Sequence, residues 1–204
     1  MNRIIDILVC RHANRPKDKT KDDITPQGAM NCFYLAKWLK AIGYTPERVV
    51  HSGAVRTRKT AHIMAAAIGL FDLTPEKNYN FHERKAADRV IKQGKYKDMQ
   101  AIIECVKEIS QAKSSVRMAR EQSAYARAGR RIIQQALREL GRDMREKGQS
   151  TAWVISHSPF TELATTKPEI TLFCIGYCDT ILYRMNAENL KITGHQFIPA
   201  AITI

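Results

Sequence analysis

Four short segments of the sequence carry side chains that together suit chemistry on an anion. They are the Arg11-His12 pair, the Ser52–Ala61 segment with Arg56, the Glu83-Arg84 pair, and the Ser156–Ser158 segment with His157. A planar guanidinium matches the oxygens of a phosphoryl group with parallel hydrogen bonds. A neutral imidazole nitrogen is a nucleophile near neutral pH, and a carboxyl group can transfer protons. Each of these short motifs also occurs by chance in unrelated sequences, so each alone is weak evidence. The set has a shared function only if the fold brings the segments together.

Each of these segments follows an extended piece of chain. Buried strands are predicted at Ile4–Val9, Arg48–His51 and Ala152–Ser156, and a third short extended piece is predicted at Tyr79–His82. Ile4–Val9 is an almost continuous run of isoleucine, leucine and valine, which favours a buried strand. Because parallel strands end at the same edge of a sheet, we expect three of the segments to converge there, namely those with Arg11-His12, Arg56 and His157.

Helices are predicted between these strands. Thr25-Pro26 begins the first, with threonine as N-cap and proline at the first helical position, and Gly43 ends it. Ser52 is expected to cap the second, which runs to about Ile68. From Arg84 to Lys147 the pattern is helical in at least two segments, with breaks predicted at Gly94 and at Ser114-Ser115 and an end at Gly148.

The last part of the chain predicts a β-hairpin, with Asp179–Met185 and Lys191–Phe197 as strands around a turn at Asn186–Asn189. Strands that alternate with helices indicate an α/β fold with a central, mostly parallel sheet flanked by helices. The length suits a single domain over residues 1–204. The helical segment, at about 84–147, is expected to lie over the rim of the site.

The motifs, in this order, resemble those of the histidine phosphatase superfamily, the phosphoglycerate-mutase-like group. That family has Arg-His-Gly after its first strand, then Ser-x-x-x-Arg-x-x-x-Thr-Ala, a catalytic acid, and Ser-His-Gly or Gly-His-Gly after a late strand. Thr25-Pro26-Gln27-Gly28 also resembles the family's Leu-Thr-x-x-Gly helix start. The resemblance extends from Ile4 to about Met185, but Lys85–Gly148 matches only as generic helix.

The resemblance implies a role for each motif residue. His12 is the nucleophile that forms a phosphohistidine, Arg11 and Arg56 bind the phosphoryl oxygens, and His157 donates a hydrogen bond to them. Glu83 is the favoured general acid and base, with Glu76, Asp72 and Asp88 as alternatives. The candidate substrate contacts are Asn14, Arg15, Arg84 and Ser158. This scheme needs no metal and no cofactor.

The sequence departs from the family pattern at two positions. Ala13 and Ser158 stand where the family has glycine, and Pro159 follows directly. Glycine permits a positive φ and a close backbone approach to an anion, and proline removes a backbone donor. These departures bear on substrate class and efficiency rather than on the fold.

The leading hypothesis is therefore a phosphatase that hydrolyses a phosphorylated small molecule or a phosphoprotein through phosphohistidine at His12. The alternatives are a phosphoglycerate-mutase-type phosphotransferase and a non-catalytic phosphate-binding interaction protein. The net charge of +13 attracts anions, but the basic residues are dispersed, which does not favour nucleic-acid binding. We also hypothesise a basic lid, with Lys92, Lys95 and Lys97 selecting an acidic substrate.

Composition bounds the remaining possibilities. The hydrophobic share is 44%, and no apolar run approaches the roughly 20 residues that span a bilayer, so no membrane partner is expected. The five cysteines form no CxxC pair, which favours reduced thiols and a cytoplasmic location. His51, His62, His82 and His195 lack metal-ligand spacing and are interpreted as structural or surface residues.

Overall fold

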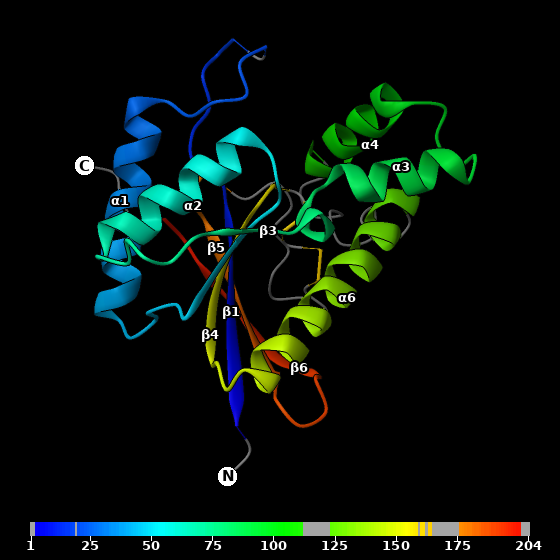
Figure 1. The fold of residues 1–204 in the computed structure, drawn as a ribbon. Coiled ribbons are helices and arrows are strands. Elements are labelled where there is room, and N and C mark those ends of the chain that lie inside the picture. Colours follow the sequence, from blue (N-terminus) through cyan, green and yellow to red (C-terminus); the bar gives the residue numbers. More distant parts are fainter. Residues whose placement is uncertain are drawn as a thin grey trace.

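A six-stranded sheet forms the centre of the protein, in the order β3-β2-β4-β1-β5-β6 (Figure 1). This computed structural model describes residues 3–18, 20–111, 123–158, 160–161, 163–164 and 176–200. The strands are β1 (Ile4–Arg11), β2 (Arg48–His51), β3 (Glu76–Lys77), β4 (Thr151–Ser156), β5 (Thr180–Asn186) and β6 (Ile192–Ile198).

The sheet is mostly parallel, as the sequence predicted. β1 and β2 both pair in parallel with β4, and β3 pairs in parallel with β2. β5 is antiparallel to β1 and to β6, which confirms the predicted C-terminal hairpin. The three adjacent strands β2, β4 and β1 therefore end side by side at one edge of the sheet.

Helices cover both faces of the sheet (Figure 1). They are α1 (Pro26–Ala41), α2 (Val55–Ala67), α3 (Arg84–Lys92), α4 (Met99–Gln111) and α6 (Ala124–Glu146). Side chains alternate along β1, so Ile7 packs into the core beside α6 whereas Leu8 packs into the core beneath α1 and α2. This alternation gives the strand a buried side chain on each face.

The predicted helix boundaries largely agree with the structure. The Thr25 side chain accepts a hydrogen bond from the Gly28 amide at 3.0 Å, and Pro26 begins α1. Gly94 separates α3 from α4 with a φ of +66°, which glycine adopts without strain. The predicted break at Ser114-Ser115 lies outside the described residues.

Two local predictions were wrong. The segment predicted as extended at Tyr79–His82 is a 3-10 helix, η1 (Tyr79–Phe81), and the strand β3 precedes it. The Asn78 side chain accepts a hydrogen bond from the Asn80 amide, which favours a turn over an extended chain. Ser52 does not cap α2; the N-cap is Ala54, and Asp22 accepts from the Val55 amide instead, at 2.9 Å.

The thiols of Cys10, Cys32, Cys105 and Cys178 are free, in agreement with the expectation of reduced cysteines. Cys174 lies outside the described residues. Within the parts of the chain that the structure describes, every helix is too short or too polar to cross a membrane.

Candidate active site

The two motif histidines meet because their strands are neighbours in register. His12 follows β1 and His157 follows β4, and Arg11 pairs with Ser156 between these strands. The His12 amide donates to the Ser156 carbonyl at 3.0 Å, which extends the ladder by one residue. The two imidazole rings lie edge to face, with centroids 5.3 Å apart. The predicted convergence at the carboxyl edge of the sheet therefore holds for both residues.

The four-residue spacing of the second motif has a geometric cause. Arg56 and Thr60 lie one turn apart on α2 and face the end of β1. Thr60 Oγ1 accepts a hydrogen bond from the Ala13 amide at 3.1 Å and donates to the Arg56 carbonyl at 2.8 Å. The threonine thus holds the chain just after His12, while the arginine reaches the imidazoles.

The Arg56 guanidinium determines the tautomer of both histidines. Its Nε–H donates to His12 Nε2, and Nη2 donates to His157 Nδ1, each at 3.0 Å. Arginine can only donate, so both of these ring nitrogens carry lone pairs. The remaining proton of His12 is on Nδ1, which donates to the Ala13 carbonyl at 2.7 Å. His12 Nε2 therefore directs a lone pair towards the guanidinium.

A chain of hydroxyl groups fixes the other side of His157. Its Nε2–H donates to Ser52 Oγ at 2.8 Å, Ser52 Oγ is 3.1 Å from Thr57 Oγ1, and Thr57 Oγ1 donates to the Ala54 carbonyl at 2.9 Å. Because the Thr57 hydroxyl donates its proton to the carbonyl, it can only accept from Ser52, so the Ser52 hydroxyl is the donor to Thr57. Ser52, the first residue of the second motif, thus orients an imidazole rather than capping a helix.

Both histidines are neutral in this site. Burial lowers the pKa of His12 to about 3. The hydrogen bond to Ala13 opposes this shift, and the nearby arginines add to it. Burial, with Arg56 and His12 nearby, holds the pKa of His157 well below its ordinary value. Neutral imidazole is the form that has a lone pair for nucleophilic attack.

Glu83, the N-cap residue of α3, lies beside this cluster. Its Oε1 lies 3.6 Å from Arg56 Nη2 and 4.0 Å from His157 Nδ1. Ser156 Oγ donates to the Phe81 carbonyl, which ties η1 to the end of β4 and so sets the place of Glu83 two residues later. Glu83 is therefore the candidate acid that lies beside Arg56 and His157.

The alternative carboxylates lie elsewhere. Glu76 forms an ion pair with Arg48 at 2.6 Å on the sheet, and Asp72 and Asp88 are exposed and are not part of the cavity lining.

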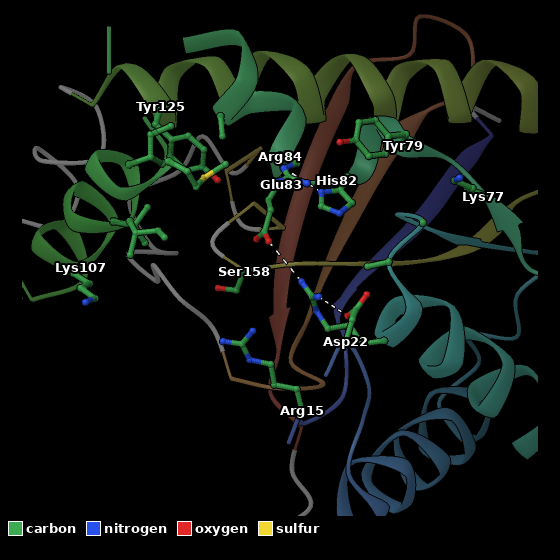
Figure 2. Close-up of a pocket in the computed structure, with 18 residues that line it drawn as sticks. Arg15, Asp22, Lys77, Tyr79, His82, Glu83, Arg84, Lys107, Tyr125 and Ser158 are labelled. Carbon is green, nitrogen blue, oxygen red and sulfur yellow. Dashed lines mark hydrogen bonds and ion pairs between the residues drawn. The ribbon is translucent and has the colours of Figure 1, made fainter. Parts of the chain in front are cut away.

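Asp22 is a site residue that the motif analysis missed. Its Oδ1 lies 2.6 Å from Arg56 Nη1, on the opposite side of the guanidinium from Glu83 (Figure 2). Burial disfavours the charged carboxylate, but the hydrogen bonds from Arg56 and Val55 prevail and lower the pKa of Asp22. Asp22 belongs to a polar loop with several lysines and aspartates, and no spacing rule singles it out.

Two aromatic rings were also missed. The Arg11 guanidinium carbon lies 4.2 Å from the centre of the Tyr177 ring, a cation–π geometry that orients this arginine beside His12. The His82 ring lies 4.7 Å from the His157 ring, so a histidine interpreted as structural or surface borders the site. Burial and the positive charge of Arg56 lower the pKa of His82.

A cavity of about 840 Å³ opens beside Arg56 and Glu83 (Figure 2). Three of the candidate substrate contacts line it: Arg15, Arg84 and Ser158. Asn14 is not part of this lining; its backbone carbonyl accepts from the Thr25 amide at 2.8 Å and so joins the loop after His12 to α1. The lysines of the hypothesised basic lid, Lys92, Lys95 and Lys97, also do not line it.

The two departures from the family motifs are accommodated by the backbone. Among the described residues other than glycine, only Cys178 and Leu190 have a positive φ. Ala13 and Ser158 therefore occupy ordinary backbone conformations, and the site does not need glycine at either position for its φ angle.

The fold matches that of several solved enzyme structures. Phosphoglycerate mutase from Bacillus anthracis superposes with a TM-score of 0.64 and 11% identity, over 95% of this chain and 93% of that chain. The protein histidine phosphatase SixA superposes with a TM-score of 0.58 and 15% identity, over 95% of this chain and 94% of that chain. A mycobacterial glucosyl-3-phosphoglycerate phosphatase superposes with a TM-score of 0.58 and 12% identity, over 96% of this chain and 97% of that chain.

No family model and no curated protein sequence matches this chain. At such low identity, the structural matches establish the architecture and not the activity. The chain therefore has the same α/β fold as this mutase and these phosphatases, which is the fold that its motifs suggested.

Proposed function

We propose that this protein is a phosphatase that hydrolyses a phosphomonoester through a phosphohistidine on His12. The observation that carries the proposal is the double hydrogen bond from Arg56 to His12 Nε2 and His157 Nδ1. A phosphoryl group that binds beside Arg56 would accept hydrogen bonds from the guanidinium as it meets the lone pair of His12. Arg11, oriented by Tyr177, is the second guanidinium for the oxygens.

In the first step, His12 Nε2 attacks phosphorus and the ester P–O bond breaks. Glu83, as a carboxylic acid, gives its proton to the leaving oxygen. The Nδ1–H to Ala13 hydrogen bond persists and shares the positive charge that develops on the phosphorylated imidazole. The arriving phosphoryl dianion raises the pKa of His157, which favours an Nδ1–H that donates to a phosphoryl oxygen.

In the second step, water attacks the phosphorus of the phosphohistidine and the P–N bond breaks. The Glu83 carboxylate accepts the proton of that water, which returns the acid to its starting form. Inorganic phosphate leaves, and His12 Nε2 regains its lone pair. Acid–base assistance of this kind contributes about 10²–10⁴ in rate.

The direct test is hydrolysis of 4-nitrophenyl phosphate in EDTA by the wild type and by His12→Asn, together with trapping of acid-labile phosphate on the protein. We expect turnover and trapped phosphate only in the wild type. Trapped phosphate at another residue, or turnover in His12→Asn, would contradict the proposal. Activity that requires a bisphosphorylated primer would instead indicate a mutase.

A further inference from the structure

One side of the cavity beside the proposed catalytic groups is apolar. Helix α4 lines it with Met99, Ile102, Ile103 and Val106, which are spaced at i, i+3, i+4 and i+7 and so form one stripe of the helix. Tyr125, at the start of α6, continues this surface. We call these five residues the apolar lobe.

The lobe lies across the cavity from Asp22, which pairs with the proposed anion-binding residue Arg56. In Figure 2, Tyr125 lies on the far side of the cavity from Asp22, with Glu83 and Ser158 between them. Glu83 is the residue that meets the leaving oxygen in the proposed mechanism. The group attached to that oxygen would therefore extend past Glu83 towards α4.

Physical chemistry limits what such a surface selects. Polar hydroxyls of a sugar or glycerate lose hydrogen bonds with water against isoleucine, valine and methionine side chains, which return none. An alkyl chain or aromatic ring gains free energy there in proportion to the apolar area that it removes from water.

We propose that the apolar lobe binds the leaving group of the substrate, and that the substrate is a phosphomonoester of a hydrophobic alcohol. This inference rests on the proposed function, which sets the direction of the leaving group. It also replaces the hypothesised basic lid, because Lys92, Lys95 and Lys97 do not line the cavity; Lys107 of α4 lines it beside the apolar stripe.

The test is binding of alkylphosphonates, whose C–P bond is stable to this mechanism, measured by titration calorimetry. Methyl-, butyl- and octylphosphonate form the alkyl series, and phenylphosphonate separates an aryl preference from an alkyl one. Full burial of a methylene contributes about fourfold in affinity. We expect about twofold per methylene, or on the order of 100-fold between methyl and octyl.

Ile103→Ser tests the lobe, because this side chain is 42% exposed and its replacement leaves the buried core intact. Ile42→Ser is the matched control, since Ile42 is 45% exposed and lies at the end of α1, away from the cavity. We expect the octyl-to-methyl affinity ratio to fall at least about fivefold in Ile103→Ser and to stay at its wild-type value in Ile42→Ser.

Hydrolysis of methyl and octyl phosphate, run in parallel, separates this inference from the proposed function. Turnover of both esters with no dependence of phosphonate affinity on chain length would overturn the lobe and keep the phosphatase. A steep dependence without any ester turnover would keep the lobe as a ligand site and reject the phosphatase. An unchanged ratio in Ile103→Ser would also overturn the lobe.

Discussion

At the scale of single residues, the site depends on how one guanidinium is shared. Arg56 contacts two imidazoles through Nε and Nη2, while Asp22 contacts its Nη1. Glu83 lies farther away, at 3.6 Å from Nη2. The two carboxylates therefore stand at different distances from the same cation: Asp22 pairs closely with it, and Glu83, the proposed acid, lies farther away.

Replacing Glu83 with glutamine removes the proposed proton donor and preserves the size of the side chain. For an alkyl phosphate, whose leaving oxygen needs a proton, we expect kcat to fall about 10²–10⁴-fold. For 4-nitrophenyl phosphate, whose leaving group departs without a proton, the rate of phosphoenzyme formation should fall much less. Rapid-quench measurement of phosphoenzyme formation with both esters checks this difference.

Asp88→Asn is the control for Glu83→Gln, because Asp88 lies on α3 and does not line the cavity. It should keep wild-type kcat with both esters. Equal losses with both esters in Glu83→Gln would argue against its role as the acid.

Asp22→Asn removes the negative charge that faces Arg56. The anion site becomes more positive, so inorganic phosphate should bind more tightly, by up to about fivefold because an exposed ion pair contributes at most about 1 kcal/mol. Competitive inhibition by phosphate measures this change. Asp23→Asn is a matched control, since the neighbouring Asp23 pairs with Lys59 and not with Arg56. Weaker phosphate binding in Asp22→Asn would show that positioning of Arg56 outweighs the charge.

At the scale of elements, the contact between α1 and the loop after His12 depends on a missing side chain. A Cβ at Gly28 would lie 2.7 Å from the Asn14 carbonyl oxygen and 2.9 Å from the Asn14 amide nitrogen. Both are backbone atoms of the segment that follows the nucleophile. The glycine in the Thr-Pro-Gln-Gly segment thus permits a close approach rather than a special φ.

Gly28→Ala should therefore destabilise the protein by about 1–3 kcal/mol through overpacking, although alanine is the better helix former by about 1 kcal/mol. Urea unfolding measures this loss. Gly194→Ala is the control, because its Cβ would meet nothing within 4 Å. Gly28→Ala should also lower kcat, since the displaced loop carries Ala13, the acceptor of the His12 proton. A stabilised Gly28→Ala protein would contradict the predicted clash.

At the scale of the whole molecule, burying neutral histidines at the sheet edge makes stability depend on pH. The pKa of His12 is about 3 in the folded protein and about 6.5 when the chain unfolds. Between these values the unfolded chain binds the additional proton, so the free energy of unfolding falls as the pH decreases. His157 and His82, whose pKa values are also lowered, act in the same direction.

For His12 alone, this linkage amounts to about 2 kcal/mol between pH 7.5 and pH 5.0. Urea unfolding at the two pH values should show at least this loss in the wild type. His12→Asn should remove the contribution of His12 and so reduce the dependence of the free energy of unfolding on pH. Equal pH dependence in the two proteins would mean that His12 titrates normally in the folded state.

The sequence by itself predicted β1, β2, β4, the C-terminal hairpin, most helix boundaries and the set of motif residues, but it did not predict β3. Local signals suffice for these features: apolar runs predict the buried strands, and Thr25-Pro26 and Gly94 mark helix boundaries. Because adjacent parallel strands end at one edge, the approach of His12 to His157 also follows from the chain order once the sheet is parallel.

Only the tertiary structure decided what surrounds those residues. Asp22 reaches Arg56 from a loop 34 positions away in sequence, and Tyr177 stacks on Arg11 from beyond β4. Ser52 bonds an imidazole 105 positions later instead of capping the adjacent helix. The charge of a loop does not predict which side chain the loop will contact, and the periodicity of α4 does not predict which cavity its apolar stripe will line. Such contacts depend on how distant segments pack, and they leave no local pattern in the sequence.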